Sequence, residues 1–198
     1  MKRGATGGGY REMMGGGRPS PYPGAVRLPR TFVFVDLSGF TDFTATRGDD
    51  ASGELLARFR AVVREVASER GVRVAKWLGD GAMIVSVDFQ PSVAAALDLM
   101  EVCEIECAPL HLRAGIASGR ALLFEGDDYI GTAVNLAARL CDTAGAGQLY
   151  LALDGAGELP PGAKARKVEP ITIRGFAEPI AVAELGGRVA RTTASTVA

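Results

Sequence analysis

The hydrophobic positions of the chain predict a series of strands and helices that begins near Arg30. The first run, TFVFVD, is β-branched and aromatic without polar alternation and ends at Asp36, which is typical of a central strand buried on both faces. Gly39 interrupts this pattern, and the apolar residues of 53–70 then recur at helical spacing until Gly71. We therefore expect a buried strand followed by a helix that packs on it.

The later segments continue this alternation. Residues 72–88 predict a hairpin with Gly79, Asp80 and Gly81 at its turn. The remaining predicted elements are a helix at 91–106, strands around Ser118 and Gly119 within 110–124, a helix at 132–143, and strands at 148–153, 166–174 and 179–185. This order predicts an α+β fold of the ferredoxin-like or palm type, a sandwich with helices packed on a mostly antiparallel sheet.

Length and composition predict one domain with flexible ends. A chain of 198 residues is long enough for one unit with a hydrophobic core. Residues 1–29 are dominated by Gly, Pro, Ser and Arg, and they have too little apolar material to offset the entropy of ordering them. We expect a flexible extension there, a domain at 30–186 and a flexible tail at 187–198. A basic arm that contacts an acidic partner is the alternative for the first segment.

Charge and hydropathy argue against a nucleic-acid-binding or membrane protein. The first thirty residues carry +5, which leaves −6 of the total charge of −1 for the rest of the chain. Such an acidic body, without a basic aromatic face, disfavours nucleic acid as a partner. The chain has no apolar run of about 18 residues and no secretory signal core, so we expect a cytoplasmic protein outside the membrane. Cys103, Cys107 and Cys141 lack CxxC spacing and are expected to be reduced core thiols.

Two aspartates at the ends of neighbouring predicted strands are candidates for chemistry. Asp36 terminates an otherwise apolar strand, where a carboxylate is costly unless it is solvated, paired or metal-bound. Asp80 lies at the hairpin turn, so the two carboxylates can converge on divalent cations that also hold phosphate oxygens. The Leu37 carbonyl can join this coordination. A turn or capping aspartate is the alternative for both Asp80 and Asp36.

The segment SGFT, which comprises Ser38, Gly39, Phe40 and Thr41, directly follows Asp36. Its glycine permits close backbone approach, and the start of the following helix offers unpaired N–H donors to anionic oxygens. We therefore expect it to bind phosphates, with an ordinary strand-to-helix turn as the alternative.

Three further polar residues occupy positions that invite a function. Lys76 shares strand parity with the aliphatic Val74, so it either recognises a ligand or extends its head group to water from an apolar face. Asn135 and Arg139 are four residues apart and lie on one face of their predicted helix. They either act together on a ligand or form an exposed polar face, with Arg139 paired to Asp142.

Five segments of the chain, in this order, resemble the catalytic domain of class III adenylyl and guanylyl cyclases: FVDLSGFT, VAKWLGDGAM, LRAGIASG, DDYIGTAVNLAARL and IRGFAEP. Together they span roughly residues 31–185, and the chain is similar to the small bacterial members that are common in actinobacteria. The resemblance implies an adenylate cyclase, an enzyme that converts ATP to 3′,5′-cyclic AMP and pyrophosphate.

The resemblance also implies a two-metal mechanism. Asp36 and Asp80, assisted by the Leu37 backbone, would bind two divalent cations, Mg²⁺ or Mn²⁺. The cations would activate the ribose 3′-hydroxyl and hold the triphosphate for in-line attack on the α-phosphorus. Some relatives place a lysine for the terminal phosphates where this chain has Phe176, which leaves Arg174 as the substitute.

By the same resemblance, Lys76 and Asp128 would read the base. Asn135 would orient the ribose, and Arg139 would stabilise charge on the α-phosphate. Asp127 is the rival of Asp128, because the connection before it is shorter than in the animal enzymes. Lys76 can donate to adenine N1 and Asp128 can accept from the exocyclic amine, whereas guanine reverses both contacts, so we expect ATP rather than GTP.

The resemblance finally implies an assembly. In these cyclases one subunit supplies the metal-binding aspartates, and the other supplies the base-reading and transition-state residues. A chain that holds the complete set is therefore expected to form a homodimer with two equivalent sites. The alternatives are a guanylyl or dual-specificity cyclase and a catalytically silent module that binds nucleotide or a partner.

Overall fold

The computed structural model describes residues 26–125 and 128–190. Most of the predicted N-terminal extension, and the predicted tail from residue 191, lie outside the described residues. The described elements are β1 (Val26–Ser38), α1 (Phe40–Arg70), β2 (Arg73–Leu78), β3 (Gly81–Ser86), α2 (Phe89–Glu106), β4 (His111–Phe124), β5 (Asp128–Ile130), α3 (Thr132–Thr143), β6 (Leu149–Ala152), β7 (Ala163–Lys167) and β8 (Val182–Gly187). Residues 26–29, expected in the extension, are part of β1.

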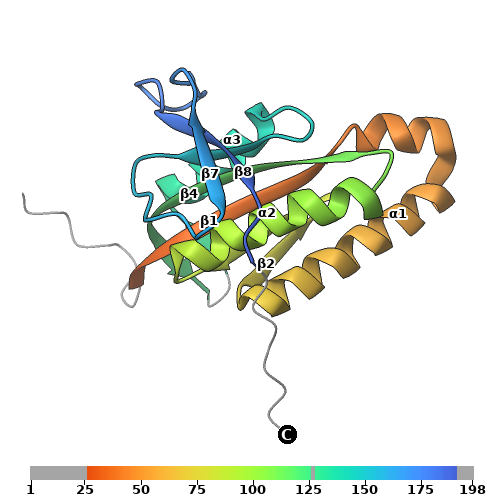
Figure 1. Ribbon diagram of the computed structural model, residues 1–198, viewed down its shortest axis with the longest axis horizontal. Coiled ribbons are helices and arrows are strands. Elements are labelled where there is room, and N and C mark those ends of the chain that lie inside the picture. The colour runs from red at the N-terminus through yellow and green to blue at the C-terminus, as the bar shows by residue number, and fades with distance from the viewer. Residues whose placement is uncertain (1–25, 126–127, 191–198) are drawn as a thin grey trace, which may run out of the picture.

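The described strands form a single sheet in the order β2-β3-β1-β4-β6-β8-β7, with β5 paired to β4. Neighbouring strands are antiparallel except β4 and β6, which run parallel. Helices α1 and α2 cover one face of the sheet, and α3 covers the other (Figure 1). The predicted α+β architecture, with helices packed on a mostly antiparallel sheet, is confirmed.

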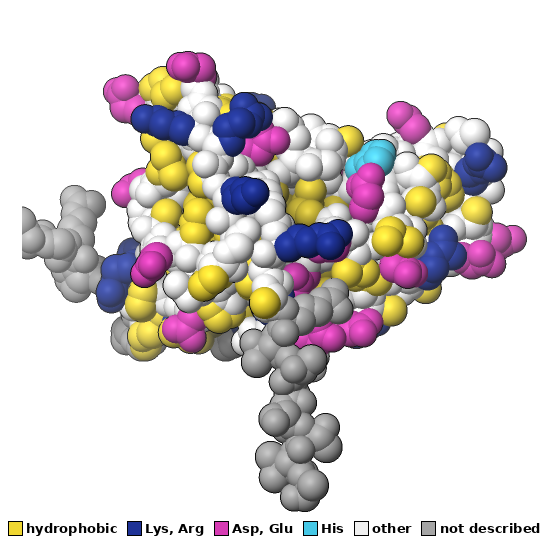
Figure 2. Space-filling view, viewed as in Figure 1, with side chains coloured by type: hydrophobic (Ala, Val, Ile, Leu, Met, Phe, Trp, Pro, Cys, Tyr) yellow, Lys and Arg dark blue, Asp and Glu magenta, His cyan; other side chains and the backbone are white. Residues whose placement is uncertain are grey.

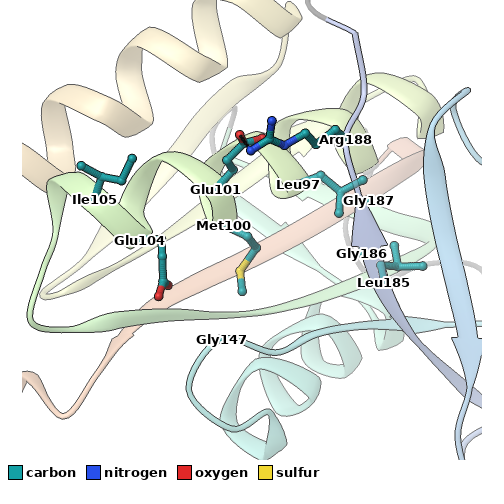
Figure 3. Close-up of a pocket in the computed structure, with 10 residues that line it drawn as sticks. All are labelled: Leu97, Met100, Glu101, Glu104, Ile105, Gly147, Leu185, Gly186, Gly187 and Arg188. Carbon is teal, nitrogen blue, oxygen red and sulfur yellow. Dashed lines mark ion pairs between the residues drawn. The ribbon is translucent and has the colours of Figure 1, made fainter.

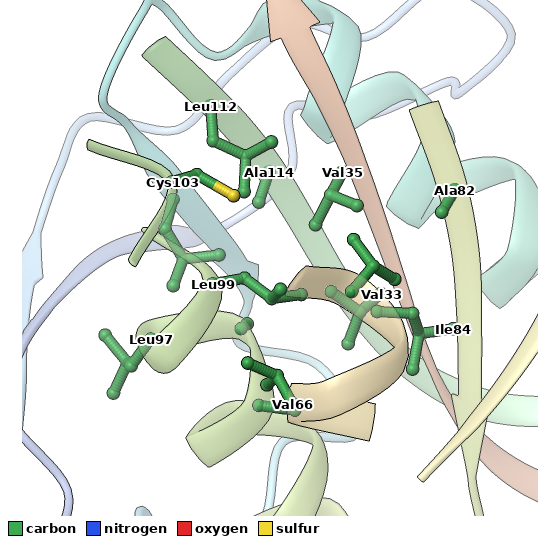
Figure 4. Close-up of a cluster of buried hydrophobic side chains, with 14 of the residues drawn as sticks. Val33, Val35, Val66, Ala82, Ile84, Leu97, Leu99, Cys103, Leu112 and Ala114 are labelled. Carbon is green, nitrogen blue, oxygen red and sulfur yellow. The ribbon is translucent and has the colours of Figure 1, made fainter. Parts of the chain in front are cut away.

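Strand β1 is apolar on both sides because each face of the sheet carries a hydrophobic cluster. Val33 and Val35 of β1 belong to the cluster under α1 and α2, together with Val66 and Leu99 from those helices (Figure 4). Phe32 belongs to the cluster under α3. Side chains of a strand alternate between its faces, so β1 must be apolar at consecutive positions to supply both clusters.

Three predicted elements differ from the structure. Helix α1 begins at Phe40 rather than near residue 53, and its backbone is non-helical at Gly48. β4 runs without a break through Ser118 and Gly119, where strand ends were expected. Gly119 pairs with Arg30 of β1, and a Cβ at this glycine would lie 3.0 Å from the Cβ of Ala133 in α3, so the glycine permits close packing of α3. The strand expected at 166–174 lies at Ala163–Lys167, and only an isolated bridge at Ile171 follows it.

The cysteine prediction is confirmed, since Cys103, Cys107 and Cys141 are buried and free. None of the described helices combines the length and the apolar composition that crossing a bilayer requires.

A buried ion pair joins α1, α2 and the end of the described chain. Arg70, the last residue of α1, donates from Nε to Asp98 Oδ2 at 2.7 Å and from Nη2 to Asp98 Oδ1 at 3.0 Å. Two of its other N–H groups donate to the backbone oxygens of Val189 and Ala190. The two side chains are only 10% and 6% exposed, so water compensates little if one of them is lost.

We therefore expect Arg70→Met to lower the free energy of unfolding by about 3–5 kcal/mol, because the Asp98 carboxylate stays buried without its bidentate partner. The matched change Arg166→Met, which removes an exposed ion pair with Glu184, should cost at most about 1 kcal/mol. Urea unfolding followed by circular dichroism measures both changes. Equal losses in the two variants would contradict the structural role of the buried pair.

Candidate active site

Asp36 lies where β1 is flanked by β3 and β4. Its Cα pairs with Gly81 on one side and with Arg113 on the other. Side chains of directly paired residues point to the same face, and strand alternation places Asp36 on the α3 side of the sheet. A Cβ at Gly81 would lie 2.7 Å from the Val35 oxygen and 3.1 Å from Asp36 Oδ1. Only glycine therefore leaves room for the Asp36 carboxylate.

Arg113 holds the Asp36 carboxylate from the β4 side. Its Nε and Nη2 donate to Asp36 Oδ2 at 2.9 and 2.6 Å, and its Nη1 donates to the backbone oxygen of Asp142 at the end of α3. Burial raises the pKa of Asp36 above its ordinary value, the Arg113 hydrogen bond opposes this, and the nearby Asp80 carboxylate raises the pKa further. The site thus retains a surplus of negative charge.

Sequence reasoning missed Arg113. Arg113 is a charged residue within the apolar segment Leu112–Ile116 of β4. A charged residue in an apolar strand indicates a partner or a function, as it did for Asp36. We expected the phosphate-binding cation at Arg174 instead. Arg174 is exposed in a turn, and Phe176 packs against the α3-side cluster.

The turn that carries Asp80 is anchored to both β1 and α1. The Leu37 N–H donates to the Asp80 backbone oxygen at 3.2 Å, and Arg60 of α1 donates to the Gly79 oxygen at 3.3 Å. Arg60 and Arg64 both lie over the Trp77 ring, with Cζ 5.2 and 5.1 Å from its centroid. The structure therefore brings Asp80 next to Asp36, as the hairpin prediction required, and Trp77 acts in packing.

The two aspartates fit a divalent cation by their chemistry. Carboxylates are hard oxygen ligands. A cation beside them would offset the energetic cost of burying the Asp36 charge and the repulsion between Asp36 and Asp80. No group of three or more His, Cys, Asp or Glu side chains within the described ranges could hold a metal. Two carboxylates leave coordination positions for a ligand's phosphate oxygens and for water, which is the arrangement that Mg²⁺ favours.

The SGFT segment connects this site to α1. Ser38 ends β1, Gly39 adopts a left-handed conformation with φ of 84°, and α1 begins at Phe40 without a side-chain cap. The first N–H groups of a helix have no partner within the helix, so those that follow Gly39 are available to an anion. Phe40 packs against the α1/α2-side core and fixes this end of the helix.

A β-bulge places Lys76 on the same face as Asp36. The register of β2 shifts between Val74, which pairs with Ile84, and Lys76, which pairs with Met83. Ile84 belongs to the α1/α2-side cluster and Met83 to the α3-side cluster. Lys76 therefore does not share the face of Val74, and the prediction of a shared face was wrong because the bulge makes the strand irregular.

Lys76 and Asp128 form a partly buried ion pair. Lys76 Nζ lies 2.6 Å from Asp128 Oδ1, and this hydrogen bond lowers the pKa of Asp128. The two residues are thus neighbours, although they are far apart in the sequence. Asp127, the rival candidate, lies outside the described residues.

Asn135 and Arg139 lie on the exposed side of α3, and the buried side of this helix covers the sheet. Arg139 Nη1 is 3.3 Å from Asp142 Oδ2, which is the exposed ion pair that was the alternative reading. The structure therefore places these two side chains on a surface rather than in a pocket of their own chain.

A separate groove lies on the α1/α2 side of the sheet. It is about 580 Å³ in volume and runs between α2 and β8, lined by residues that include Met100, Glu104 and Leu185 (Figure 3). Arg188 pairs with Glu101 across it at 2.7 Å. The face in Figure 2 shows basic and acidic side chains interspersed, without a surface of one sign. None of the predicted site residues lines this groove.

Comparison with known proteins identifies relatives in sequence. No family model matches the chain. The chain is 39% identical over 152 residues to an uncharacterized protein of Mycobacterium tuberculosis, covering 77% of this chain and 40% of the relative. It is 34% identical over 132 residues to a pH-sensitive adenylate cyclase of the same species, covering 67% of this chain and 32% of the relative. The chain thus spans about two fifths or less of the length of these relatives.

Solved structures share the fold. The adenylyl cyclase CyaB from P. aeruginosa superposes with a TM-score of 0.73 at 21% identity, covering 85% of this chain and 98% of that chain. The guanylyl cyclase Cya2 superposes with a TM-score of 0.67 at 20% identity, covering 87% of this chain and 98% of that chain. The fold is therefore common to enzymes named for either nucleotide.

The close approach of Gly81 to Asp36 gives a direct test of the site. In Gly81→Ala the new methyl group must displace the Asp36 carboxylate or β3, so we expect the affinity for Mn²⁺ to fall about 10-fold or more. Electron paramagnetic resonance of free Mn²⁺ measures this affinity, and circular dichroism checks the fold. Gly53→Ala is the matched control, because its Cβ meets nothing within 4 Å. Native Mn²⁺ affinity in Gly81→Ala would contradict the assignment.

Proposed function

Since this chain carries a class III adenylyl and guanylyl cyclase domain by fold and by sequence kinship, we propose that it converts ATP to 3′,5′-cyclic AMP and pyrophosphate. The observation that supports this proposal most directly is that Asp36 and Asp80 lie next to each other at the end of β1, beside Gly81. The Lys76–Asp128 pair lies on the same face of the sheet. The alternative is a guanylyl or dual-specificity cyclase.

The metal half of the proposed site consists of Asp36, Asp80 and the Leu37 backbone. Bound there, two divalent cations, Mg²⁺ or Mn²⁺, would lower the pKa of the ribose 3′-hydroxyl and offset charge on the triphosphate. The N–H groups of the SGFT segment would bind phosphate oxygens at the start of α1. Arg113, already beside Asp36, adds a cation that can turn to a phosphate once metal replaces it as the carboxylate's partner.

The base half of the proposed site is the Lys76–Asp128 pair. Asp128 Oδ1 accepts from Lys76, which leaves further Lys76 N–H groups and the second carboxylate oxygen for a ligand. The lysine would donate to adenine N1, and the aspartate would accept from the exocyclic amine. A guanine in the same position would present a donor to the lysine and an acceptor to the aspartate, and such mismatches are costly.

The transition-state residues favour a homodimer. Asn135 and Arg139 lie on the exposed face of α3, where a second chain can contact them. In a two-fold dimer each site would combine the aspartates of one chain with Asn135 and Arg139 of its partner. Asn135 would orient the ribose, and Arg139 would stabilise the charge that develops on the α-phosphate.

Purified protein with ATP and Mn²⁺ should produce cyclic AMP, and Asp36→Ala should reduce the rate at least about 10³-fold because the metal site is lost. Chromatographic detection of cyclic AMP and, with GTP, of cyclic GMP measures both points. Cyclic GMP as the main product would overturn the base assignment alone. A protein that forms neither product would refute the enzyme and favour a nucleotide-binding module.

The shared site predicts complementation between two inactive variants. Asp36→Ala and Arg139→Ala should each be inactive alone, but a mixed dimer contains one site with neither change. Mixing the two should therefore restore up to about one quarter of the native rate, the share of sites expected from random pairing. An activity that stays at the level of the separate variants would argue against a site built from two chains.

A further inference from the structure

We propose that Tyr129 and Arg73 are positioning residues that fix the base-reading pair and thereby set the preference for ATP over GTP. This inference rests on the proposed function. It concerns contacts on the α3 side of the sheet that the sequence motifs did not indicate.

The base-reading pair joins two strands that are not neighbours. Lys76 belongs to β2, at one edge of the sheet, whereas Asp128 begins β5. β5 is three residues long, and β4 is its only partner among the described strands. β3 and β1 lie between β4 and β2. Three backbone pairs are a weak attachment for a short strand. Side chains must therefore hold Asp128 in place beside Lys76.

Tyr129 provides this attachment. Its ring meets Phe32 of β1 edge to face, with centroids 5.4 Å apart and an interplanar angle of 69°. On β2, Arg73 lies with its Cζ 5.8 Å from the same ring centroid, and its Nη2 donates to the Tyr129 hydroxyl at 3.2 Å. Aromatic, cation–π and hydrogen-bond contacts thus tie β5 to two strands with which it does not pair.

The bulge in β2 allows both Arg73 and Lys76 to contact β5. Arg73 pairs with Val85 and Lys76 pairs with Met83, and both partners belong to the α3-side cluster. In a regular strand, residues three apart point to opposite faces. Because the bulge adds one residue, Arg73 and Lys76 share a face and can hold two consecutive residues of β5, Tyr129 and Asp128.

The same residue also orients the Asp128 carboxylate. The Tyr129 N–H donates to Asp128 Oδ1 at 3.2 Å, and Lys76 donates to the same oxygen. Among the hydrogen bonds of the described residues, none engages Oδ2 of Asp128. One oxygen is therefore committed to the protein, and the other is left to accept a hydrogen bond from a base.

Fixing the pair is what allows it to discriminate. Adenine and guanine both offer one donor and one acceptor on this edge, in opposite order. A donor and an acceptor that could move relative to a bound nucleotide would match either base, whereas a fixed donor and acceptor match only one order. The Tyr129–Arg73 contact therefore acts on selectivity through the position of Asp128, and not through the bond-forming step.

Three variants test the inference: Tyr129→Phe, which removes only the hydroxyl, Arg73→Gln, and the conservative Arg73→Lys. For Tyr129→Phe and Arg73→Gln, we expect the ratio of kcat/KM for ATP to that for GTP to fall about three- to ten-fold. The change should lie in KM for ATP, with kcat within about two-fold. Hydrogen exchange of residues 122–125 and 128–130 should become faster. Arg73→Lys, which keeps a charge and a donor, should restore most of the ratio.

Tyr150→Phe is the matched control. Tyr150 packs on the same α3-side cluster, but its hydroxyl donates to Gln148 and not to a residue that contacts Lys76 or Asp128. It should leave both the nucleotide ratio and the exchange of 122–125 and 128–130 unchanged. Unaltered exchange in Tyr129→Phe, or faster exchange with an unaltered nucleotide ratio, would overturn the inference. A native protein that turns over neither nucleotide would instead refute the proposed function, and the exchange data would still decide whether the contact holds β5.

Discussion

The Asp36 carboxylate is the group around which the described structure is arranged. A partly buried carboxylate at the end of an apolar strand requires compensation, and Arg113 on the adjacent strand supplies it through two N–H groups to one oxygen. The other oxygen faces β3, where Gly81 has no side chain to block it. The pairing of three strands thus positions a carboxylate and a cation side by side, and the Asp80 turn lies next to them.

The close packing of α3 on the sheet depends on β4, the strand that carries Arg113. A Cβ at Gly115 of β4 would lie 2.3 Å from the Ala137 oxygen and 2.4 Å from the Cys141 nitrogen, so α3 can lie this close to the sheet only over a glycine. Because α3 packs this closely, the Asp142 backbone oxygen accepts a hydrogen bond from Arg113, whose other N–H groups donate to Asp36. The position of the helix that carries Asn135 and Arg139 is therefore coupled physically to the carboxylate of the same chain.

Much of the fold followed from periodicity, and what failed did so for local reasons. The apolar run before Asp36 predicted the buried part of β1, and the helical spacing at 132–143 predicted α3, because both segments are buried on the sheet. Gly119 was expected to lie between two strands, since a sequence cannot distinguish a glycine that ends a strand from one that allows a helix to pack closely. The β2 bulge was equally hidden, because an inserted residue leaves no mark in the pattern of apolar positions.

Site residues could be predicted where the residue type and its position indicate a function. They could not be predicted where the function depends on contacts with residues far away in the sequence. Asp36 and Asp80 stood out as carboxylates at strand ends, and their proximity followed from the hairpin. Lys76 and Asp128 came together only through the resemblance, since no local rule links residues 52 positions apart. Arg113 was missed because its importance comes from a partner 77 positions away.

The exposed pair of Arg139 and Asp142 is compatible with a function in another chain. Both side chains are more than half exposed, at 54% and 62%, and their closest charged atoms are 3.3 Å apart. Such a pair contributes at most about 1 kcal/mol, so releasing the arginine costs little. A charge-assisted hydrogen bond to a phosphate is stronger than this contact. Asp142 would meanwhile keep its backbone bond to Arg113, so that moving Arg139 toward a nucleotide in a partner chain leaves the Asp36 end of the site intact.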